Sequence, residues 1–192
     1  MVESGLRGVP DPSALFLADR QTGVAGSVVV PTLEGQRPLM VELQVLTNKV
    51  KPDIPARRSA QGLDPGRLAM LLAVLGQRVK APVSQHEVYA SVVGGVKLSE
   101  PGTDLGLCLA VLSALSGQPL PPTVVAFGEV GLGGEVRQVA HASRRLAEAS
   151  RLGFTKALVP ATTQTVDGPM KVERISTLRQ ALQVLGMSVP QH

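Results

Sequence analysis

The chain has 192 residues, of which 44% are hydrophobic and 2% aromatic, and it carries 19 Lys and Arg against 15 Asp and Glu. This length suits one domain with an aliphatic core, and the formal charge of +4 permits binding to an anion without requiring it. A single cysteine excludes an intramolecular disulfide, and no apolar run reaches the ~18 residues of a membrane span. We therefore expect a soluble cytoplasmic protein with a lead-in segment at residues 1–13 and one domain at residues 14–188.

The first part of the chain predicts strands. Residues 14–17 are apolar and are expected to form a short strand after the lead-in segment. Two longer β-type runs, at residues 26–33 and 38–46, flank a turn sequence that contains Gly35. Because two such runs around a glycine turn are typical of a hairpin, we expect them to pair antiparallel.

Two helices follow from capping and from apolar periodicity. Asp64 and Pro65 are an N-cap residue and a proline at the first helical position, so a helix is expected to run to about Arg78. Residues 103–115 are apolar on nearly every side, and a helix without a polar face is buried. Cys108 lies in this second helix and is interpreted as a small core residue.

The remaining signals are strands and helices that alternate along the chain. Strands are expected at residues 88–93, 124–127, 135–139, 156–160 and 170–175, and helices at residues 141–152 and 177–185. Because hairpins are mixed with strand–helix–strand units, these elements predict an α/β fold with mixed-sheet layers (α+β).

A basic loop is the main candidate for a binding surface. Lys49, Lys51, Arg57 and Arg58 are interrupted by two prolines, which exclude a regular helix and indicate an exposed loop, and Arg67 starts the next helix. Basic residues in such a loop can contact successive phosphates, so we predict DNA binding through these five residues, independent of sequence and sensitive to salt. The alternative is a solvated loop that binds nothing.

Two short blocks resemble the catalytic region of Lon-type serine–lysine proteases. Residues 115–119 and 128–130 align with the Lon pattern without gaps. Counted from these blocks, the position of the nucleophilic serine falls on Gly102, and the position of the lysine that activates it falls on Arg145. Glycine has no oxygen to attack a carbonyl, and a guanidinium with a pKa above ~12 cannot act as a neutral general base. The resemblance therefore predicts the protease fold without its dyad.

The chain as a whole is similar to the C-terminal Lon-like domain of the bacterial RadA (Sms) family. The similarity lies in several blocks in the same order, at residues 6–17, 56–58, 67–75, 92–97 and 127–132. It implies a Lon protease proteolytic-domain-like fold (ribosomal protein S5 domain 2-like). It also implies a non-catalytic role in a hexameric motor for DNA repair, recombination and branch migration, acting in ring assembly and DNA binding.

The resemblance also implies partners and cofactors. The partners would be single- or double-stranded DNA, further copies in a homohexamer, and the RecA-like motor domain of the same protein. ATP with Mg²⁺ and zinc are expected only in N-terminal domains that this chain lacks, because it has no C-x-x-C pair and no nucleotide-binding glycine loop. The alternatives are a Lon-fold peptidase with an unconventional nucleophile and a purely structural oligomerisation module.

Several residues near the two relic positions have simpler interpretations. Thr103 and Asp104 suit the first turn of a helix, where they would accept free backbone N–H groups. Gly102 is interpreted as a position where the backbone turns sharply. Arg144 and Arg145 face either the relic cleft, a neighbouring subunit or solvent.

Other reactive or metal-binding groups are weak candidates. A displaced Ser–Lys pair would need Ser99 or Ser143 near Lys97, and the spacing does not favour one. Glu129 and Glu135 flank a glycine hairpin, which explains the glycines without a metal. We therefore expect no metal site in this chain.

Overall fold

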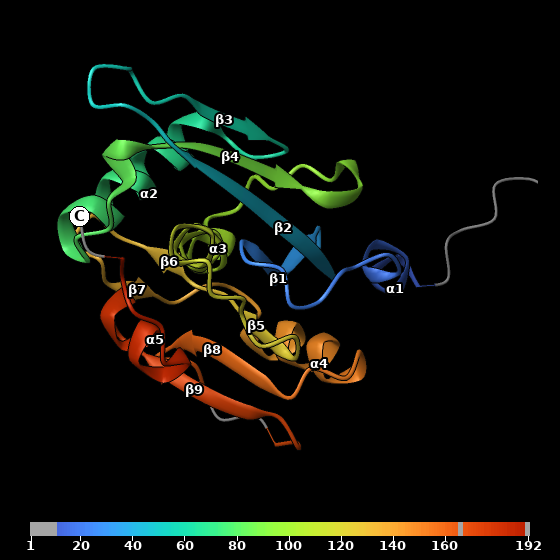
Figure 1. Cartoon of the computed structure of the whole chain (residues 1–192). Helices are drawn as coiled ribbons and strands as arrows, with labels where there is room; N and C mark the ends of the chain where they lie inside the picture. The colour runs from blue at the N-terminus through green and yellow to red at the C-terminus, as the bar shows by residue number, and fades with distance from the viewer. Residues whose placement is uncertain (1–10, 165–166, 191–192) are drawn as a thin grey trace, which may run out of the picture.

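The computed structural model describes residues 11–164 and 167–190. Seven strands form the main sheet: β1 (Ser27–Glu34), β2 (Arg37–Lys49), β3 (Arg58–Gln61), β4 (His86–Val92), β5 (Val124–Ala126), β8 (Lys156–Pro160) and β9 (Lys171–Ile175). Their order across the sheet is β3-β4-β2-β1-β5-β8-β9 (Figure 1). β2 pairs antiparallel with β1 and β4, and the other neighbouring strands pair parallel. The sheet is therefore mixed and mostly parallel, which confirms the predicted α/β class.

Helices cover both faces of this sheet. The α-helices of the described residues are α1 (Pro12–Leu17), α2 (Pro65–Arg78), α3 (Asp104–Ser116), α4 (Ala142–Arg151) and α5 (Leu178–Leu185). Short 3₁₀ turns lie at η1 (Val83–Gln85), η2 (Val93–Gly95) and η3 (Pro101–Thr103), and a separate hairpin joins β6 (Glu129–Val130) to β7 (Val136–Arg137). One apolar cluster joins α2, α3 and α5 to one face of the sheet, and a second joins α1 and α4 to the other. The domain is thus a three-layer structure.

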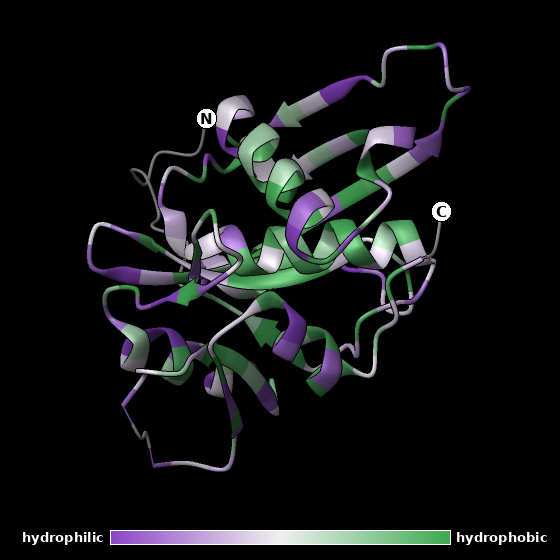
Figure 2. Cartoon of the chain, turned by 90° about the vertical axis from the view of Figure 1, so that its left-hand side faces the viewer, coloured by the Kyte–Doolittle hydropathy of each residue, from purple (hydrophilic) through white to green (hydrophobic). Residues whose placement is uncertain are grey.

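The central helix is α3, as its apolar sequence predicts. Residues 104–113 are all buried, and Cys108 is fully enclosed among aliphatic side chains. Burial raises the pKa of the Cys108 thiol, so it stays protonated and unreactive. Figure 2 shows apolar residues in the interior and hydrophilic residues on the outer helices and loops.

The predicted hairpin and the capped helix are both confirmed. β1 and β2 pair in register from Ser27 opposite Gln44 to Glu34 opposite Arg37, and Gly35 in the turn has φ +60°. This left-handed conformation favours glycine. α2 begins after Asp64, as expected.

Residues 14–17 belong to a helix, and the expected strand is wrong. The Asp11 carboxylate accepts a hydrogen bond from the Ala14 N–H at 3.1 Å, and Pro12 occupies the first helical position. These are start signals of a helix, and they outweigh the β-type composition of four apolar residues.

α1 is joined to the domain through a buried serine. The Ser13 hydroxyl donates to Glu148 Oε1 at 2.8 Å and accepts from the Met40 N–H at 3.1 Å. The expected boundary after residue 13 therefore falls inside α1. Residues 1–10 of the expected lead-in segment lie outside the described residues.

The cover of β2 changes along its length. Residues 39–43 are buried on both faces, whereas residues 44–48 alternate between buried and exposed side chains. Helices and loops therefore cover both faces of the sheet near its middle but only one face toward β4 and β3. Within residues 11–164 and 167–190, every helix is too short or too polar to cross a lipid bilayer.

Candidate functional site

The structure brings Gly102 and Arg145 together, although they are far apart in the sequence. Gly102 lies in η3 just before α3, and Arg145 lies on α4. A Cβ atom placed on Gly102 would lie 3.2 and 3.3 Å from the Nη1 and Nη2 atoms of Arg145. The two positions that the Lon resemblance assigns to a nucleophile and its base therefore share one site.

Space, rather than backbone conformation, favours a glycine at position 102. Gly102 does not have a positive φ, so a sharp backbone turn does not explain why this position is a glycine. The same hypothetical Cβ would also lie 3.1 Å from Glu100 Oε2. The volume that a serine side chain needs is thus bordered closely by an ion pair.

Arg145 is 0% exposed, and each nitrogen of its guanidinium donates a hydrogen bond. Nη1 and Nη2 donate to the two carboxylate oxygens of Glu100 at 2.7 and 2.6 Å. The same group donates to the carbonyl oxygens of Pro31 (2.8 Å) and Ala140 (3.0 Å), and it lies over the Phe127 ring at 5.7 Å. Because the guanidinium is buried and pairs with both oxygens of Glu100, its position is fixed. A guanidinium that stays protonated cannot act as a proton acceptor.

Of the alternatives for the two arginines, Arg144 follows the solvated-face interpretation, whereas Arg145 is buried beside Gly102. Arg144 is exposed and donates to the carbonyl of Gln36 at 3.2 Å. Glu100 was not identified from the sequence, because its role depends on α4 and on Thr32 of β1, whose hydroxyl donates to it at 3.0 Å. The only feature of the sequence that points to Glu100 is its position two residues before Gly102.

A second ion pair lies beside the first. The buried carboxylate of Asp104 accepts from Nε of Arg67 at 2.9 Å, from Nη2 of the same arginine, and from the Val130 N–H at 3.0 Å. Burial raises the pKa of Asp104, while these hydrogen bonds act in the opposite direction. The hydrogen bonds that Arg67 donates to Asp104 are the main cause of the raised pKa of Arg67.

The predicted cap at the start of α3 is therefore wrong. Thr103 makes no capping hydrogen bond, and its hydroxyl instead donates to the Glu100 carbonyl at 3.2 Å. Asp104 bonds to α2 and β6, which local sequence does not reveal. A cavity of about 320 Å³ lies next to these groups, with Arg67, Ser99 and Asp104 in its wall.

The other reactive candidates form no hydrogen bonds or ion pairs with one another among the described residues. In the described part of the chain, no hydrogen bond joins Ser99 or Ser143 to Lys97. Glu129 lies 3.8 Å from Arg67, and Glu135 pairs with Arg137 at 2.9 Å, so each carboxylate has a cation nearby. No group of three metal-binding side chains is found among residues 11–164 and 167–190.

The five basic residues predicted to contact DNA separate into two groups. Lys49, Lys51 and Arg57 are exposed at the loop between β2 and β3, where their side chains make no hydrogen bond or ion pair with the described residues. Arg58 starts β3 and donates to the carbonyls of Val83 at 2.5 Å and of His86. Arg67 is held by Asp104, away from the loop. Three of the five are thus available to an anionic partner.

Comparison with known proteins identifies relatives along nearly the whole chain. No protein-family profile matches it. Proteins named DNA repair protein RadA are 46% identical over 187 residues in Pseudomonas aeruginosa, 42% over 187 in Halalkalibacterium halodurans and 44% over 186 in Escherichia coli. Each alignment covers 96% of this chain, which spans about two fifths of the length of these relatives (40–41%). The RadA resemblance is therefore confirmed, and the extent is consistent with a C-terminal RadA domain.

Proposed function

We propose that this chain is the non-catalytic Lon-like domain of a RadA-type DNA repair and recombination motor that drives branch migration. Its tasks in that motor are assembly of a hexameric ring and binding of DNA. The observation that carries the proposal is that Gly102 and a buried, ion-paired Arg145 lie side by side, at the two positions that the Lon resemblance assigns to the Ser–Lys dyad. Similarity to proteins named DNA repair protein RadA over 96% of the chain supports it.

The proposal includes the Lon-like fold. Alignment of short blocks placed the serine and lysine positions at residues 102 and 145, 43 positions apart by their numbers. Their side-by-side position in the domain is what a serine–lysine protease fold requires of its two catalytic groups. The mixed sheet with helices on both faces is compatible with that fold.

The motor chemistry would reside in other parts of a longer protein. This chain has one cysteine and no nucleotide-binding glycine loop, so zinc, ATP and Mg²⁺ would be held by N-terminal domains. A RecA-like motor domain would be the partner within the same protein, and the cytoplasm would be its location.

DNA contact would come mainly from the loop cations Lys49, Lys51 and Arg57. Exposed, unpaired cations can move to neutralise phosphates, whereas Arg58 and Arg67 would first have to leave their internal partners. The contact would be to the backbone of single- or double-stranded DNA, without reading of sequence.

The test measures the mass of the chain in solution by light scattering, with and without duplex DNA, at low and moderate salt. A hexamer-sized particle that binds DNA, with affinity falling steeply as salt rises, is the expected result. The variant Lys49→Ala/Lys51→Ala/Arg57→Ala should lose DNA binding but keep its assembly state. The matched control, Arg137→Ala/Arg144→Ala/Lys171→Ala, removes the same charge elsewhere and should keep DNA binding.

Two outcomes would select the alternatives. An assembled particle that ignores DNA at low salt would mean a purely structural oligomerisation module. Covalent labelling of the chain by a fluorophosphonate, a probe of activated serines, would mean a peptidase with an unconventional nucleophile. A monomer that neither binds DNA nor reacts would overturn the proposed function of the isolated chain.

A further inference from the structure

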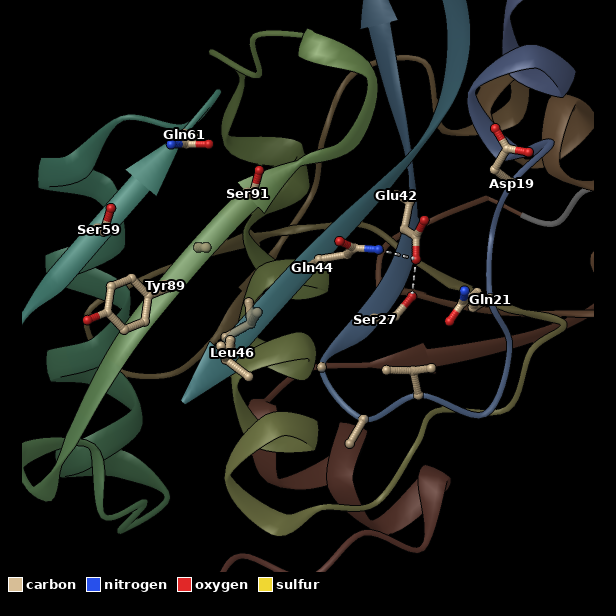
Figure 3. A pocket seen from close by; sticks show the side chains of 15 residues that line it. Asp19, Gln21, Ser27, Glu42, Gln44, Leu46, Ser59, Gln61, Tyr89 and Ser91 are labelled. Carbon is tan, nitrogen blue, oxygen red and sulfur yellow. Dashed lines mark hydrogen bonds between the residues drawn. The ribbon is translucent and has the colours of Figure 1, made fainter. Parts of the chain in front are cut away.

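A cavity of about 580 Å³ opens on the face of the sheet that the helices leave uncovered. Its walls come from the loop after α1, from the start of β1, and from β2, β3 and β4. Figure 3 shows Asp19 and Gln21 on one side, with Ser59, Gln61 and Tyr89 on the other side across β2. This cavity is separate from the Gly102–Arg145 site, because the two share no lining residue.

A buried carboxylate lies in the wall of the cavity. Glu42 is 2% exposed, and its Oε1 accepts from the Ser27 hydroxyl at 2.6 Å and from Gln44 Nε2 at 3.3 Å. No described residue donates a hydrogen bond to Oε2. Among the described residues, only Arg20 Nε and Thr163 Oγ1 are side-chain atoms that are fully buried without a hydrogen bond. Glu42 Oε2 also lacks a hydrogen bond but is not fully buried, so it is open to the cavity.

The charge of Glu42 lacks an ion-pair partner. No Lys, Arg or His of the described residues lies within ion-pair distance of it. Arg20 feels its charge electrostatically, but the Arg20 guanidinium donates to the Pro122 carbonyl at 2.9 Å and lies over the Phe154 ring. A cation bound at Oε2 would pair with this charge, and the surrounding protein would make the attraction stronger than in bulk water.

The rest of the lining is complementary to a cation on an apolar stem. Asp19 supplies a second carboxylate, and the lining contains no lysine or arginine. Val24 and Leu46, which are 49% and 68% exposed, offer unusually accessible apolar surface, and the Tyr89 ring stands beside Leu46 across the strand pair. The same negative lining disfavours phosphate, so this surface does not suit nucleic acid.

We propose that this cavity binds an arginine side chain presented by an extended peptide segment of a partner protein. The guanidinium would donate to Glu42 Oε2 and to the amide and hydroxyl oxygens of Gln44 and Ser91, and its methylene stem would pack on Leu46 and Tyr89. Arginine fits because its planar, fork-shaped group can donate to several acceptors at once and can stack on an aromatic ring. The inference is independent of the proposed function, since it uses neither the basic loop nor the relic site.

The test is an NMR titration of the isotope-labelled 192-residue chain with the peptide acetyl-Ala-Leu-Arg-Leu-Ala-amide. Backbone amide signals of Gly26, Gln44, Leu46 and Ser91 should shift and saturate. The same peptide with citrulline in place of arginine has nearly the same shape without the charge, and it should bind at least about tenfold more weakly, as expected for loss of one charged hydrogen bond.

Two variants locate the site. Glu42→Gln keeps the size of the side chain and its bond to Ser27 but removes the charge, so it should weaken the arginine peptide by about tenfold and leave the citrulline peptide unchanged. Ser91→Phe places an aromatic ring in the cavity from a partly exposed strand position, and it should abolish the shifts. Arg144→Ala, at an exposed position on α4 outside the cavity, should bind the arginine peptide as the original chain does.

Equal binding of the arginine and citrulline peptides, or full binding to Ser91→Phe, would overturn the proposal. So would shifts of the same signals on raising the protein concentration alone, because a second copy would then occupy the cavity. Since none of these variants touches the basic loop, the DNA and mass measurements test the proposed function separately.

Discussion

Arg145 and the loop cations Lys49, Lys51 and Arg57 carry the same charge in opposite surroundings. Arg145 is enclosed by Glu100, two carbonyl oxygens and the Phe127 ring, whereas the three loop side chains project into solvent without a partner among the described residues. The enclosed charge is committed to holding the fold together, and only the solvated charges can be exchanged for contacts with another molecule. The difference predicts opposite results when each is removed.

The largest expected effect is that of Arg145→Ala. It leaves the Glu100 carboxylate without its cation and opens a hole at the α4–sheet contact, so the free energy of unfolding should fall by about 3–5 kcal/mol. Urea denaturation followed by circular dichroism measures this change. Arg144→Ala, on the same helix but exposed, is the control and should change stability by less than about 0.5 kcal/mol. Equal effects of the two substitutions would contradict the structural role of Arg145.

Gly102→Ala tests how tightly the same ion pair is packed. The new methyl group would sit 3.1 Å from Glu100 Oε2, closer than a carbon and an oxygen normally approach, so we expect a loss of about 1–3 kcal/mol in unfolding free energy. The measurement is again urea denaturation. In the Arg145→Ala background the methyl group has room, and the penalty should shrink. An unchanged penalty in both backgrounds would mean that the ion pair does not limit this position.

Arg151 is half-exposed and forms ion pairs with Asp11 and Glu148. These pairs should make the stability of the fold depend on pH. The Arg151 guanidinium holds the pKa of Asp11 at about 2 and lowers that of Glu148 below its ordinary 4.5. Since both folded-state values are depressed, the stabilisation is complete above the unfolded values and is lost as pH falls from about 5 toward 2. Arg151→Gln should therefore flatten the acid limb of stability plotted against pH.

Urea midpoints at pH 7, 5, 4 and 3 measure that slope. Arg144→Gln removes an arginine from the same helix without touching either carboxylate, and its slope should match that of the original chain. If Arg151→Gln loses stability in acid as steeply as the original chain, the network does not couple α1 to α4 in this way.

The smallest effect on stability is expected from the loop. The triple variant Lys49→Ala/Lys51→Ala/Arg57→Ala should unfold within about 0.5 kcal/mol of the original chain, because no described contact is lost. Arg58→Ala, one residue farther on, removes donors to the Val83 and His86 carbonyls and should cost about 1–2 kcal/mol. Differential scanning calorimetry of the two variants compares neighbouring cations directly. Equal melting temperatures would mean that the hydrogen bonds of Arg58 do not stabilise the fold more than the solvated side chains do.

Features encoded in a few neighbouring residues could be predicted from the sequence. The β1–β2 hairpin, the start of α2 at Asp64 and the burial of α3 follow from a glycine turn, a capping pair and an apolar run. Short aligned blocks also single out Gly102 and Arg145, which the structure places side by side. For the hairpin and the start of α2, the interactions that decide the structure lie within about one hairpin or one turn of helix.

The tertiary structure alone decided which charged groups are enclosed. Nothing near Arg145 in the sequence indicates that Glu100 and Pro31 surround it, and nothing near Asp104 indicates that Arg67 displaces its capping role. The open carboxylate of Glu42 likewise depends on strands and a loop that converge only in the fold. Local sequence sets the backbone course because hydrogen bonds within turns and helices span few residues. The environment of a charge is set by partners that folding brings from distant parts of the sequence, as from Pro31 to Arg145, which are 114 positions apart.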